Sequence, residues 1–299
     1  MKLLVLVLGA EGQLGDAMAV QLGARHEVVP YSRADLDITA RTEVPAAIHA
    51  LCPDVIVNCA AYTRVDEAED HPLDALDVNA WAVRTLAETA SSLDATLVHF
   101  STDFVFDGGV ERVSTEADDA NPQSAYAATK LLGEWLAAET PRHYVLRVAS
   151  LFGGMRAASS VDRLLDAILR GDEVRAFADR TVSPSYVEDV VAATDALLAA
   201  EVPYGLYHCV NSGWTTWSGI AHELARLTGR PNARITDVSV SDVHLRAARP
   251  RFAALSNARL AAAGVPMPAW QDALARYVAE RAASRLPPAP PSRPSTGGP

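Results

Sequence analysis

The first apolar run of the chain, residues 3–8, leads directly into glycines at positions 9, 12 and 15. A continuous apolar run of this length is typical of a strand that is buried on both faces of a parallel sheet. The residues that follow, Gln13–Leu22, have the pattern of a helix. A strand, a glycine-rich turn and a helix in this order favour a dinucleotide-binding unit. The alternative interpretation is an ordinary glycine-rich loop.

Five residues of this turn are candidate cofactor contacts. Gly9 permits a tight turn, Gly12 permits close approach of a pyrophosphate, and Gly15 permits close packing of the helix. Gln13 and Leu14 begin the helix, where backbone N–H groups face phosphates. The spacing is G-x-x-G-x-x-G rather than the G-x-G-x-x-G of many dehydrogenases.

The second predicted strand, Glu27–Tyr31, ends without the acidic residue that would bind a ribose 2′-hydroxyl. Ser32 and Arg33 stand there instead. Because an arginine at this point suits a 2′-phosphate, we expect NADPH, with NADH as the alternative. A solvated surface arginine is an equally simple interpretation of Arg33.

Strands and helices alternate throughout the first half of the chain. The apolar patterns predict further strands at 54–58, 95–100 and 143–148, and helices at 42–51, 73–93 and 124–136. Residues 1–150 are therefore predicted to form a doubly wound α/β domain with a parallel sheet. Asn79 lies within the helix expected at 73–93 and needs a hydrogen-bond partner.

After residue 150 the alternation loosens. We expect residues 151–286 to form mainly a smaller substrate-binding domain, with a segment near 182–200 returning to the first domain. Helices are predicted at 159–169, 187–200 and 217–227, and strands at 173–177 and 205–210. Residues 287–299 are rich in proline and read as a disordered tail.

Tyr126 and Lys130 are four residues apart on the helix expected at 124–136, so they share one face. An ammonium beside a phenol lowers the pKa of the phenol, which makes Tyr126 a candidate proton donor. Thr102 follows the strand expected at 95–100, and its hydroxyl could hold the carbonyl that receives the proton. The alternative is a half-buried ring beside a solvated lysine.

The net charge of −11 gives no reason to expect nucleic acid or an anionic membrane as a partner. Cys52, Cys59 and Cys209 are unclustered, which argues against disulfides or zinc and fits the cytoplasm. No stretch approaches the roughly 20 apolar residues of a membrane span, and the apolar N-terminus lacks a cleavage pattern. Arg246, Arg249 and Arg251 form a cluster that suits a diphosphate, or else a solvated loop.

Three segments carry a resemblance to a known family. Residues 9–15 read GAEGQLG, residues 57–63 read VNCAAYT, and residues 101–108 read STDFVFDG. Together with Tyr126 and Lys130 they resemble the dTDP-4-dehydrorhamnose reductase family, within the extended short-chain dehydrogenase/reductase superfamily. Later matches are Pro184, residues 205–208 (GLYH), 215–217 (TTW) and 248–250 (ARP).

The resemblance implies NAD(P)H-dependent reduction of the C4 ketone of a 6-deoxy-4-keto-hexose attached to dTDP, in deoxysugar and polysaccharide biosynthesis. It implies that Tyr126 gives the proton, that Lys130 lowers the tyrosine pKa and binds the nicotinamide ribose, and that Thr102 binds the carbonyl oxygen. It adds six cofactor contacts: Asp37, Ile38, Ala60, Ala61, Tyr62 and Asn79. The implied substrate contacts, besides Thr102, are Thr63, Val65, Asp66, Asp103, Phe104, Ser150 and Arg249, the last for the diphosphate. A homodimer is one assembly that the family allows.

The sequence departs from the family pattern near the sugar. Phe104 stands where the family often has tyrosine, and Ser150 lies where a tryptophan is common. Some members have an acidic residue after the glycine motif, linked with a metal-bridged dimer. Residues 16–18 do not match that feature, so no metal is predicted.

Two other functions stay open. The first is a non-catalytic NADP-binding regulatory subunit, of the methionine adenosyltransferase beta type. The second is a nucleotide-sugar epimerase. A dehydratase typically has an acid after the Thr-Asp pair, and Phe104 stands there instead.

Overall fold

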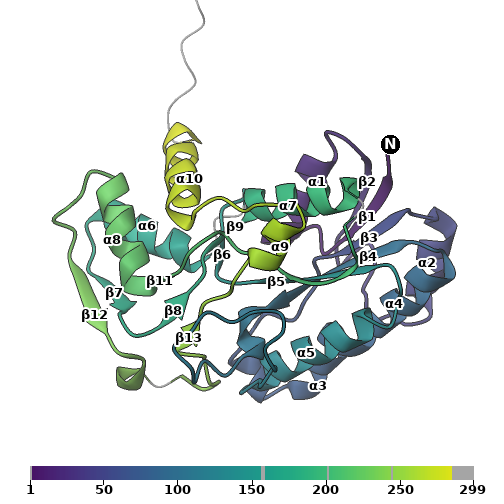
Figure 1. Ribbon diagram of the computed structural model, residues 1–299, viewed down its shortest axis with the longest axis horizontal. Helices are drawn as coiled ribbons and strands as arrows, with labels where there is room; N and C mark the ends of the chain where they lie inside the picture. Colours follow the sequence, from purple (N-terminus) through teal and green to yellow (C-terminus); the bar gives the residue numbers. More distant parts are fainter. Residues whose placement is uncertain (1, 156–158, 201, 244, 285–299) are drawn as a thin grey trace, which may run out of the picture.

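A six-stranded parallel sheet forms the centre of the larger part of the molecule (Figure 1). The structure, a computed structural model, describes residues 2–155, 159–200, 202–243 and 245–284; the expected tail at 287–299 lies outside these residues. The strand order is β10-β5-β4-β3-β1-β2. The strands are β1 (Leu4–Leu8), β2 (Glu27–Tyr31), β3 (Val55–Asn58), β4 (Thr96–Thr102), β5 (His143–Val148) and β10 (Gly205–His208). The predicted α/β class with a parallel sheet is confirmed.

The order of the strands reverses between β1 and β3. From β1 the chain moves to β2 on one side, and later to β3, β4 and β5 on the other. The loops after β1 and β3 therefore diverge and leave a crevice at the carboxyl edge of the sheet, where open α/β sheets bind ligands.

Both faces of the sheet are covered by helices, which explains why β1 is apolar at every position (Figure 1). Val5 and Val7 pack towards α1 (Gln13–Leu22) and α7 (Val187–Ala199). Leu6 and Leu8 alternate with them and pack towards α2 (Glu43–Leu51) and α4 (Ala82–Ser92). This alternation follows from the period of two along a strand.

The single helix expected over residues 73–93 is wrong in its middle. The structure has α3 (Pro72–Leu76), then a π-helical turn, η2 (Asp77–Trp81), and then α4. The wider turn carries Asn79, whose side chain is buried and hydrogen-bonded outside its own helix. Single π-turns of this kind are frequent at functional sites.

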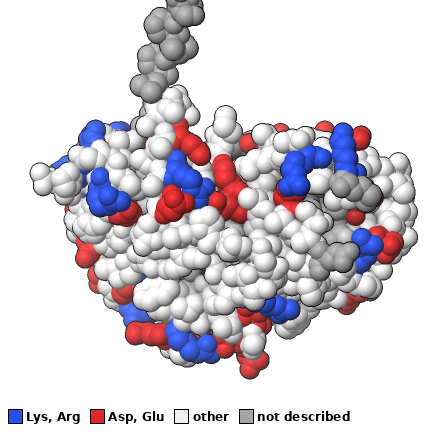
Figure 2. Space-filling model, turned by 45° about the horizontal axis from the view of Figure 1, so that its top comes forward, with Lys and Arg blue, Asp and Glu red and all other residues white. Residues whose placement is uncertain are grey.

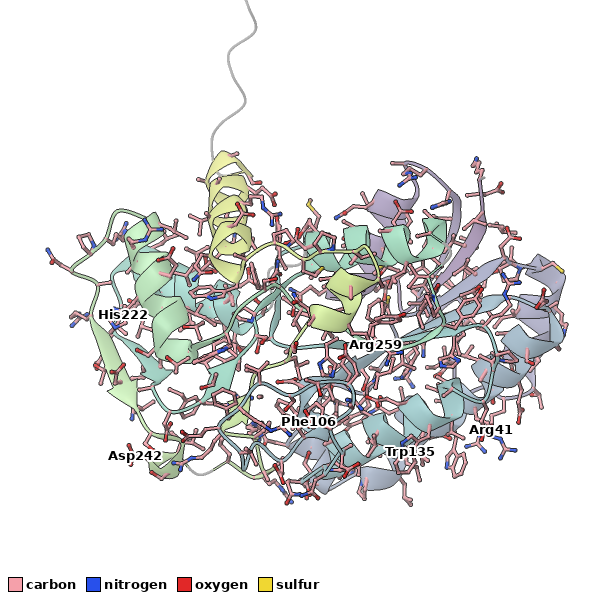
Figure 3. All side chains as sticks on the ribbon, in the orientation of Figure 1. Arg41, Phe106, Trp135, His222, Asp242 and Arg259 are labelled. Carbon is pink, nitrogen blue, oxygen red and sulfur yellow. The ribbon has the colours of Figure 1, made fainter. Side chains whose placement is uncertain are left out.

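The helix α5 (Ala125–Ala137) lies beside α4 and has two different faces. Its inner face carries Tyr126, Lys130 and Glu134, spaced four residues apart. The neighbouring Trp135 points away from the sheet and is 62% exposed (Figure 3). The helix begins at Ser124, whose hydroxyl accepts a hydrogen bond from the Ala127 N–H at 3.2 Å.

A second apolar core forms the smaller part of the molecule. Aromatic residues from three segments meet there: Phe152, Tyr186, and Trp270 with Tyr277. The surrounding elements are α6 (Ser160–Arg170), α8 (Trp217–Leu227), α10 (Trp270–Ser284), β7 (Val174–Phe177) and β12 (Ile235–Val238). Shorter elements complete the chain: β6 (Leu151–Phe152), β8 (Thr181–Val182), β9 (Ser185–Tyr186), β11 (Thr215–Thr216), β13 (Phe252–Ala253), α9 (Ala258–Ala262), η1 (Glu67–Glu69), η3 (Asp103–Val105) and η4 (Val240–Asp242).

Two segments of the expected second domain belong spatially to the large sheet. One is α7, which packs on α1, and the other is β10, which pairs with β5. The sequence analysis expected a return near residues 182–200 but not one at 205–208. The domain limits at residues 150 and 286 stay predictions.

Charged side chains of both signs lie next to one another on the face drawn in Figure 2. Many are paired, as in Arg112 with Asp118 and Arg276 with Asp189. Among the described residues, no helix is both long and apolar enough to cross a bilayer.

Candidate active site

The glycine turn after β1 is closed against the loop that follows β3. Gly9 has a φ of +74°, and a Cβ there would lie 2.7 Å from the backbone nitrogen of Ala60. The Gly12 N–H donates to the Gly9 carbonyl oxygen at 2.9 Å, and α1 begins at Gln13. The N-terminus of α1 therefore faces the crevice at the carboxyl edge, as a phosphate site requires. The Gln13 side chain donates to the Gly153 carbonyl oxygen at 2.8 Å and is held there.

Gly15→Ala is expected to disrupt this turn, because the new Cβ would lie 2.2 Å from the Gly9 carbonyl oxygen. Backbone atoms cannot rotate away, so α1 must shift from the turn. We expect NADPH affinity to fall at least roughly tenfold, about 1.4 kcal/mol, in a fluorescence titration. Gly109→Ala is the matched control, since its nearest contact would be an ordinary 3.4 Å. Unchanged NADPH affinity in Gly15→Ala would show that the turn is not the cofactor cradle.

Asn79 fixes the loop after β3, which carries Ala60, Ala61 and Tyr62. Its Oδ1 accepts from the Tyr62 N–H at 2.8 Å, and its Nδ2 donates to the Tyr62 carbonyl oxygen at 3.1 Å. The same Nδ2 donates to Thr129 Oγ1 on α5 at 3.2 Å. Asn79 thus has the partners that its burial requires, and it ties the expected cofactor loop to the helix that carries Tyr126.

Thr102 ends β4 and faces the first turn of α5. Its hydroxyl donates to Asp103 Oδ1 at 3.0 Å and accepts from the Phe104 N–H at 3.2 Å. The Thr102 side chain is close enough to the Tyr126 phenol to lower its pKa, against the larger effect of burial. The Phe104 ring meets the Tyr126 ring edge-on, with 5.9 Å between centroids. The structure therefore brings together the expected hydroxyl, phenol and sugar-side aromatic ring.

Lys130 follows Tyr126 by about one turn of α5 and is 2% exposed. Its Nζ donates to the Phe100 carbonyl oxygen at 2.6 Å and lies 3.5 Å from His99 Nε2. Burial lowers the pKa of Lys130 to about 8 and raises that of Tyr126 to about 12. The expected lowering of the tyrosine pKa is wrong in this structure, because removal of the phenol from water dominates and the ammonium points to the Phe100 carbonyl.

The sequence analysis missed His99 and Asn58 as site residues. His99 contacts the Lys130 amine, and Asn58 contacts His99. Asn58 Oδ1 accepts from the Ala60 N–H, so its NH₂ group faces His99 Nδ1 at 3.2 Å. His99 Nδ1 is then the acceptor, and its Nε2 lies 3.5 Å from Lys130 Nζ. With its pKa lowered only to about 8, Lys130 is still mainly an ammonium at neutral pH, and it donates a hydrogen bond to the Phe100 carbonyl oxygen.

Asp103 is the other unusual group. It is 3% exposed, and its Oδ2 has no hydrogen-bond partner among the described residues. Burial raises its pKa to about 6, while the nearby Arg180 acts in the opposite direction. Arg180 is itself buried and immediately precedes β8, in a region without a clear sequence pattern.

Asp103→Asn is expected to stabilise the protein above pH 6. The raised pKa means that folded Asp103 holds a proton that the unfolded chain has lost, so the free energy of unfolding falls as pH rises from about 4 to 6. A shift of about two units corresponds to about 3 kcal/mol. Urea unfolding of Asp103→Asn should show this gain at about pH 8 and little change at about pH 4. Asp119→Asn, at an exposed position, is the control; equal gains at both pH values would contradict the argument.

The remaining expected substrate contacts follow β3 and β5 or, in the case of Arg249, precede β13. Thr63 is exposed and Val65 is half-buried. Asp66 binds the guanidinium of Arg249 through both oxygens, at 2.6 and 2.7 Å, which lowers the pKa of Asp66 to about 2. Ser150 follows β5 with a φ of +47°. The fork of Arg249 is thus already occupied by Asp66.

The expected adenosine contacts lie after β2. Arg33 is exposed and its Nε donates to Asp37 at 2.9 Å. Ser32 donates to Asp35 at 2.7 Å, and Ile38 is buried. Among the described residues, no group of three or more His, Cys, Asp or Glu side chains is placed to hold a metal ion.

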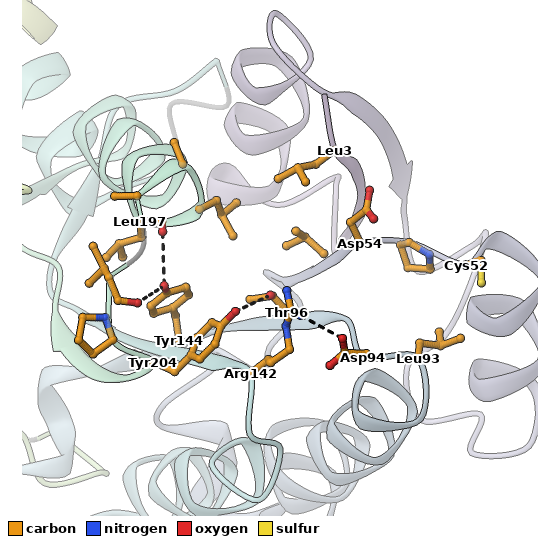
Figure 4. Close-up of a pocket in the computed structure, with 17 residues that line it drawn as sticks. Leu3, Cys52, Asp54, Leu93, Asp94, Thr96, Arg142, Tyr144, Leu197 and Tyr204 are labelled. Carbon is orange, nitrogen blue, oxygen red and sulfur yellow. Dashed lines mark hydrogen bonds and ion pairs between the residues drawn. The ribbon is translucent and has the colours of Figure 1, made fainter. Parts of the chain in front are cut away.

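A cavity of about 820 Å³ opens at the amino edge of the sheet, opposite the residues described above (Figure 4). Tyr144 donates there to the Val202 carbonyl oxygen at 2.8 Å, and Arg142 pairs with Asp94 at 3.1 Å. Ligands of open α/β sheets bind at the carboxyl edge instead, and that edge carries Thr102, Tyr126 and Lys130.

A family model described as the RmlD substrate binding domain matches residues 1–283. The chain belongs to the RmlD family. A dTDP-4-dehydrorhamnose reductase of Streptomyces griseus is 35% identical over 277 residues, covering 90% of this chain and 91% of the relative. The resemblance predicted from the sequence motifs is confirmed.

Solved structures agree with this RmlD membership. The dTDP-4-dehydrorhamnose reductase of Bacillus anthracis in complex with NADP has a TM-score of 0.89 and 30% identity, covering 94% of this chain and 100% of that one. A further relative, from Streptomyces antibioticus, is a probable dTDP-4,6-dihydroxy-2-methyloxan-3-one 4-ketoreductase. It is 32% identical over 287 residues, covering 95% of this chain and 97% of its own.

Proposed function

We propose that this RmlD-family chain reduces the C4 ketone of a dTDP-4-keto-6-deoxyhexose, as a dTDP-4-dehydrorhamnose reductase does. The observation that carries the proposal is the meeting of Thr102, Tyr126 and Lys130 at the carboxyl edge of the sheet, beside the glycine turn. A phenol, a hydroxyl and an amine in this arrangement suit proton transfer to a forming alkoxide.

The residues of the turn fit a dinucleotide. Gly9 and Gly15 leave room that a Cβ would fill with backbone contacts below 3 Å, and the N-terminus of α1 faces the crevice. Gly12, Gln13 and Leu14 would hold the pyrophosphate, and Arg33 at the end of β2 would meet a 2′-phosphate. When bound, NADPH supplies the hydride.

The chain's own residues then supply the proton and hold the ketone. Burial keeps the Tyr126 phenol protonated, with a pKa of about 12, so it is a donor throughout the neutral pH range. As the alkoxide forms, the phenol gives it a proton, and the Thr102 hydroxyl holds the same oxygen. Asp103 Oδ2 has no partner within the described chain and is free to accept from a sugar hydroxyl. Lys130 is placed to stabilise the phenolate that proton transfer leaves behind.

A second candidate function is the reduction of a different deoxysugar. Two observations favour it: Phe104 lacks a hydroxyl, and a relative from Streptomyces antibioticus is named for another deoxysugar. The test is NADPH oxidation, followed by absorbance, with dTDP-4-keto-6-deoxyglucose supplied with and without a 3,5-epimerase. Oxidation that requires the epimerase supports the rhamnose precursor as substrate. Oxidation without it supports a different deoxysugar. Binding of NADPH without oxidation in either case contradicts the proposal and favours the regulatory-subunit interpretation.

We propose that the protein acts in the cytoplasm, where its three free cysteines stay reduced. Sedimentation equilibrium tests whether it forms the homodimer that the family allows.

A further inference from the structure

Arg180 crosses from the smaller part of the molecule to the carboxyl edge of the large sheet. It immediately precedes β8, whose Thr181 N–H donates to the Arg251 carbonyl oxygen. Its guanidinium carbon lies 5.4 Å from the centre of the Phe104 ring, directly after β4. The side chain is therefore part of the catalytic crevice, although it comes from a different core than Thr102 and Asp103.

Arg180 is 9% exposed, yet it makes no hydrogen bond or ion pair with any residue that the structure describes. Its Nε is fully buried. Arg147, which is also buried, differs sharply, since it binds Glu134 at 2.7 Å. Burying a charge without a partner is unfavourable, so buried cations are normally paired or bind a ligand.

The local charges favour an anion at Arg180. Asp103 is close enough to interact electrostatically, but no contact within 4 Å joins the two among the described ion pairs. Arg249 also acts on Arg180 as a second cation. The fork of Arg249 is occupied by Asp66, whereas no described residue forms a hydrogen bond or ion pair with Arg180. A planar, unoccupied guanidinium suits phosphate oxygens.

The position of Arg180 also suits the geometry of a sugar nucleotide. The Phe104 ring neighbours both groups, 5.9 Å from the ring of the proton donor Tyr126 and 5.4 Å from the guanidinium of Arg180. A hexose lying along Phe104, with its C4 ketone at Tyr126, would direct its C1 substituent away from the phenol and towards Arg180. In the proposed substrate, that substituent is the diphosphate.

We propose that Arg180 is a substrate-binding residue that holds the diphosphate of the sugar nucleotide and thereby sets the ketone against Tyr126. The inference rests on the proposed function for the identity of the sugar, but the nucleotide half can be tested without turnover. Asp103 is then left for the sugar hydroxyls.

The experiment is a calorimetric titration of the full chain with dTDP and with thymidine. Arg180→Gln should weaken dTDP binding roughly 10- to 100-fold, the effect of losing a charged hydrogen-bond pair, and should leave thymidine binding unchanged. Arg180→Lys keeps the charge but not the planar guanidinium fork, so its dTDP affinity should lie between those of the wild type and Arg180→Gln. Arg175→Gln, an exposed position five residues earlier, is the matched control and should bind dTDP as the wild type does.

Thermal unfolding without ligand separates this role from a structural one. Because Arg180 forms no hydrogen bond or ion pair with the described residues and loses only its contact with the Phe104 ring, Arg180→Gln should unfold at about the same temperature as the wild type or higher. A lower unfolding temperature, or an equal loss of thymidine binding, would show that Arg180 supports the fold and would overturn the proposal.

The two proposals fail in different ways. If wild type and Arg180→Gln bind dTDP equally, the assignment of Arg180 is wrong, whatever the reductase assay shows. If the wild type binds dTDP through Arg180 but reduces no 4-keto sugar, the proposed function is wrong and the diphosphate site stands. If the wild type binds no dTDP, the assignment is wrong, and reduction of the keto sugar still decides the function.

Discussion

Tyr126→Phe is expected to lower kcat for ketone reduction by roughly 10²–10⁴-fold, the usual contribution of a positioned general acid. The change removes one oxygen and keeps the ring, so its edge-on contact with Phe104 at 5.9 Å should persist. NADPH affinity and unfolding temperature should therefore change little. The measurements are initial rates at saturating substrate and a fluorescence titration with NADPH.

The control for this prediction is Tyr204→Phe. Tyr204 is 40% exposed and lies at the amino edge of the sheet, in the cavity of Figure 4. The Tyr204→Phe variant should reduce the ketone at the wild-type rate. A rate for Tyr126→Phe within a few-fold of wild type would remove Tyr126 as the proton donor and leave Thr102 or Lys130 to be tested.

Glu134→Gln is expected to cause the largest loss of stability, roughly 3–5 kcal/mol, as when one partner of a buried ion pair is removed. Glu134 and Arg147 are 5% and 4% exposed. Two hydrogen bonds join them, at 2.8 and 2.7 Å, and Ser101 donates to Glu134 Oε1 at 2.5 Å. The guanidinium of Arg147 also lies 4.9 Å from the ring of Phe106, so it cannot turn out to water without losing that contact.

Urea unfolding measures the effect of Glu134→Gln. Glu88→Gln is the matched control, because Glu88 forms an exposed i,i+4 pair with Arg84 and such pairs contribute about 0–1 kcal/mol. The double variant Glu134→Leu with Arg147→Met should recover much of the loss, since no charge is then left buried alone. Equal small losses in Glu134→Gln and Glu88→Gln would contradict the argument.

The sequence predicts the parts of the site that depend on neighbouring residues. The turn at Gly9 and the helix that carries Tyr126 and Lys130 are local patterns, and both lie where the sequence placed them. The direction of Lys130 Nζ was not predictable, because it is set by the Phe100 carbonyl oxygen on β4, 30 residues earlier in the chain.

The residues that the sequence missed depend on distant contacts. The π-turn at Asp77–Trp81 presents Asn79 to Tyr62, 17 residues earlier, and to Thr129, 50 residues later. Arg180 has no signal of its own, since it stands before a strand of two residues. Arg180 is recognisable as a site residue only in the folded structure, where the position of β8 places its guanidinium next to the Phe104 ring.

The paths of α7 and β10 bear on whether the dinucleotide-binding half can exist alone. A fragment ending at residue 150 would contain the glycine turn, Thr102, Tyr126 and Lys130. It would lack β10, so β5 would become an open edge, and it would lack α7, whose Val187, Val190 and Leu197 cover one face of the sheet. Exposed strand edges and apolar faces promote aggregation. The half that binds the cofactor therefore depends for its solubility on α7 and β10, two segments that follow part of the second half in the sequence.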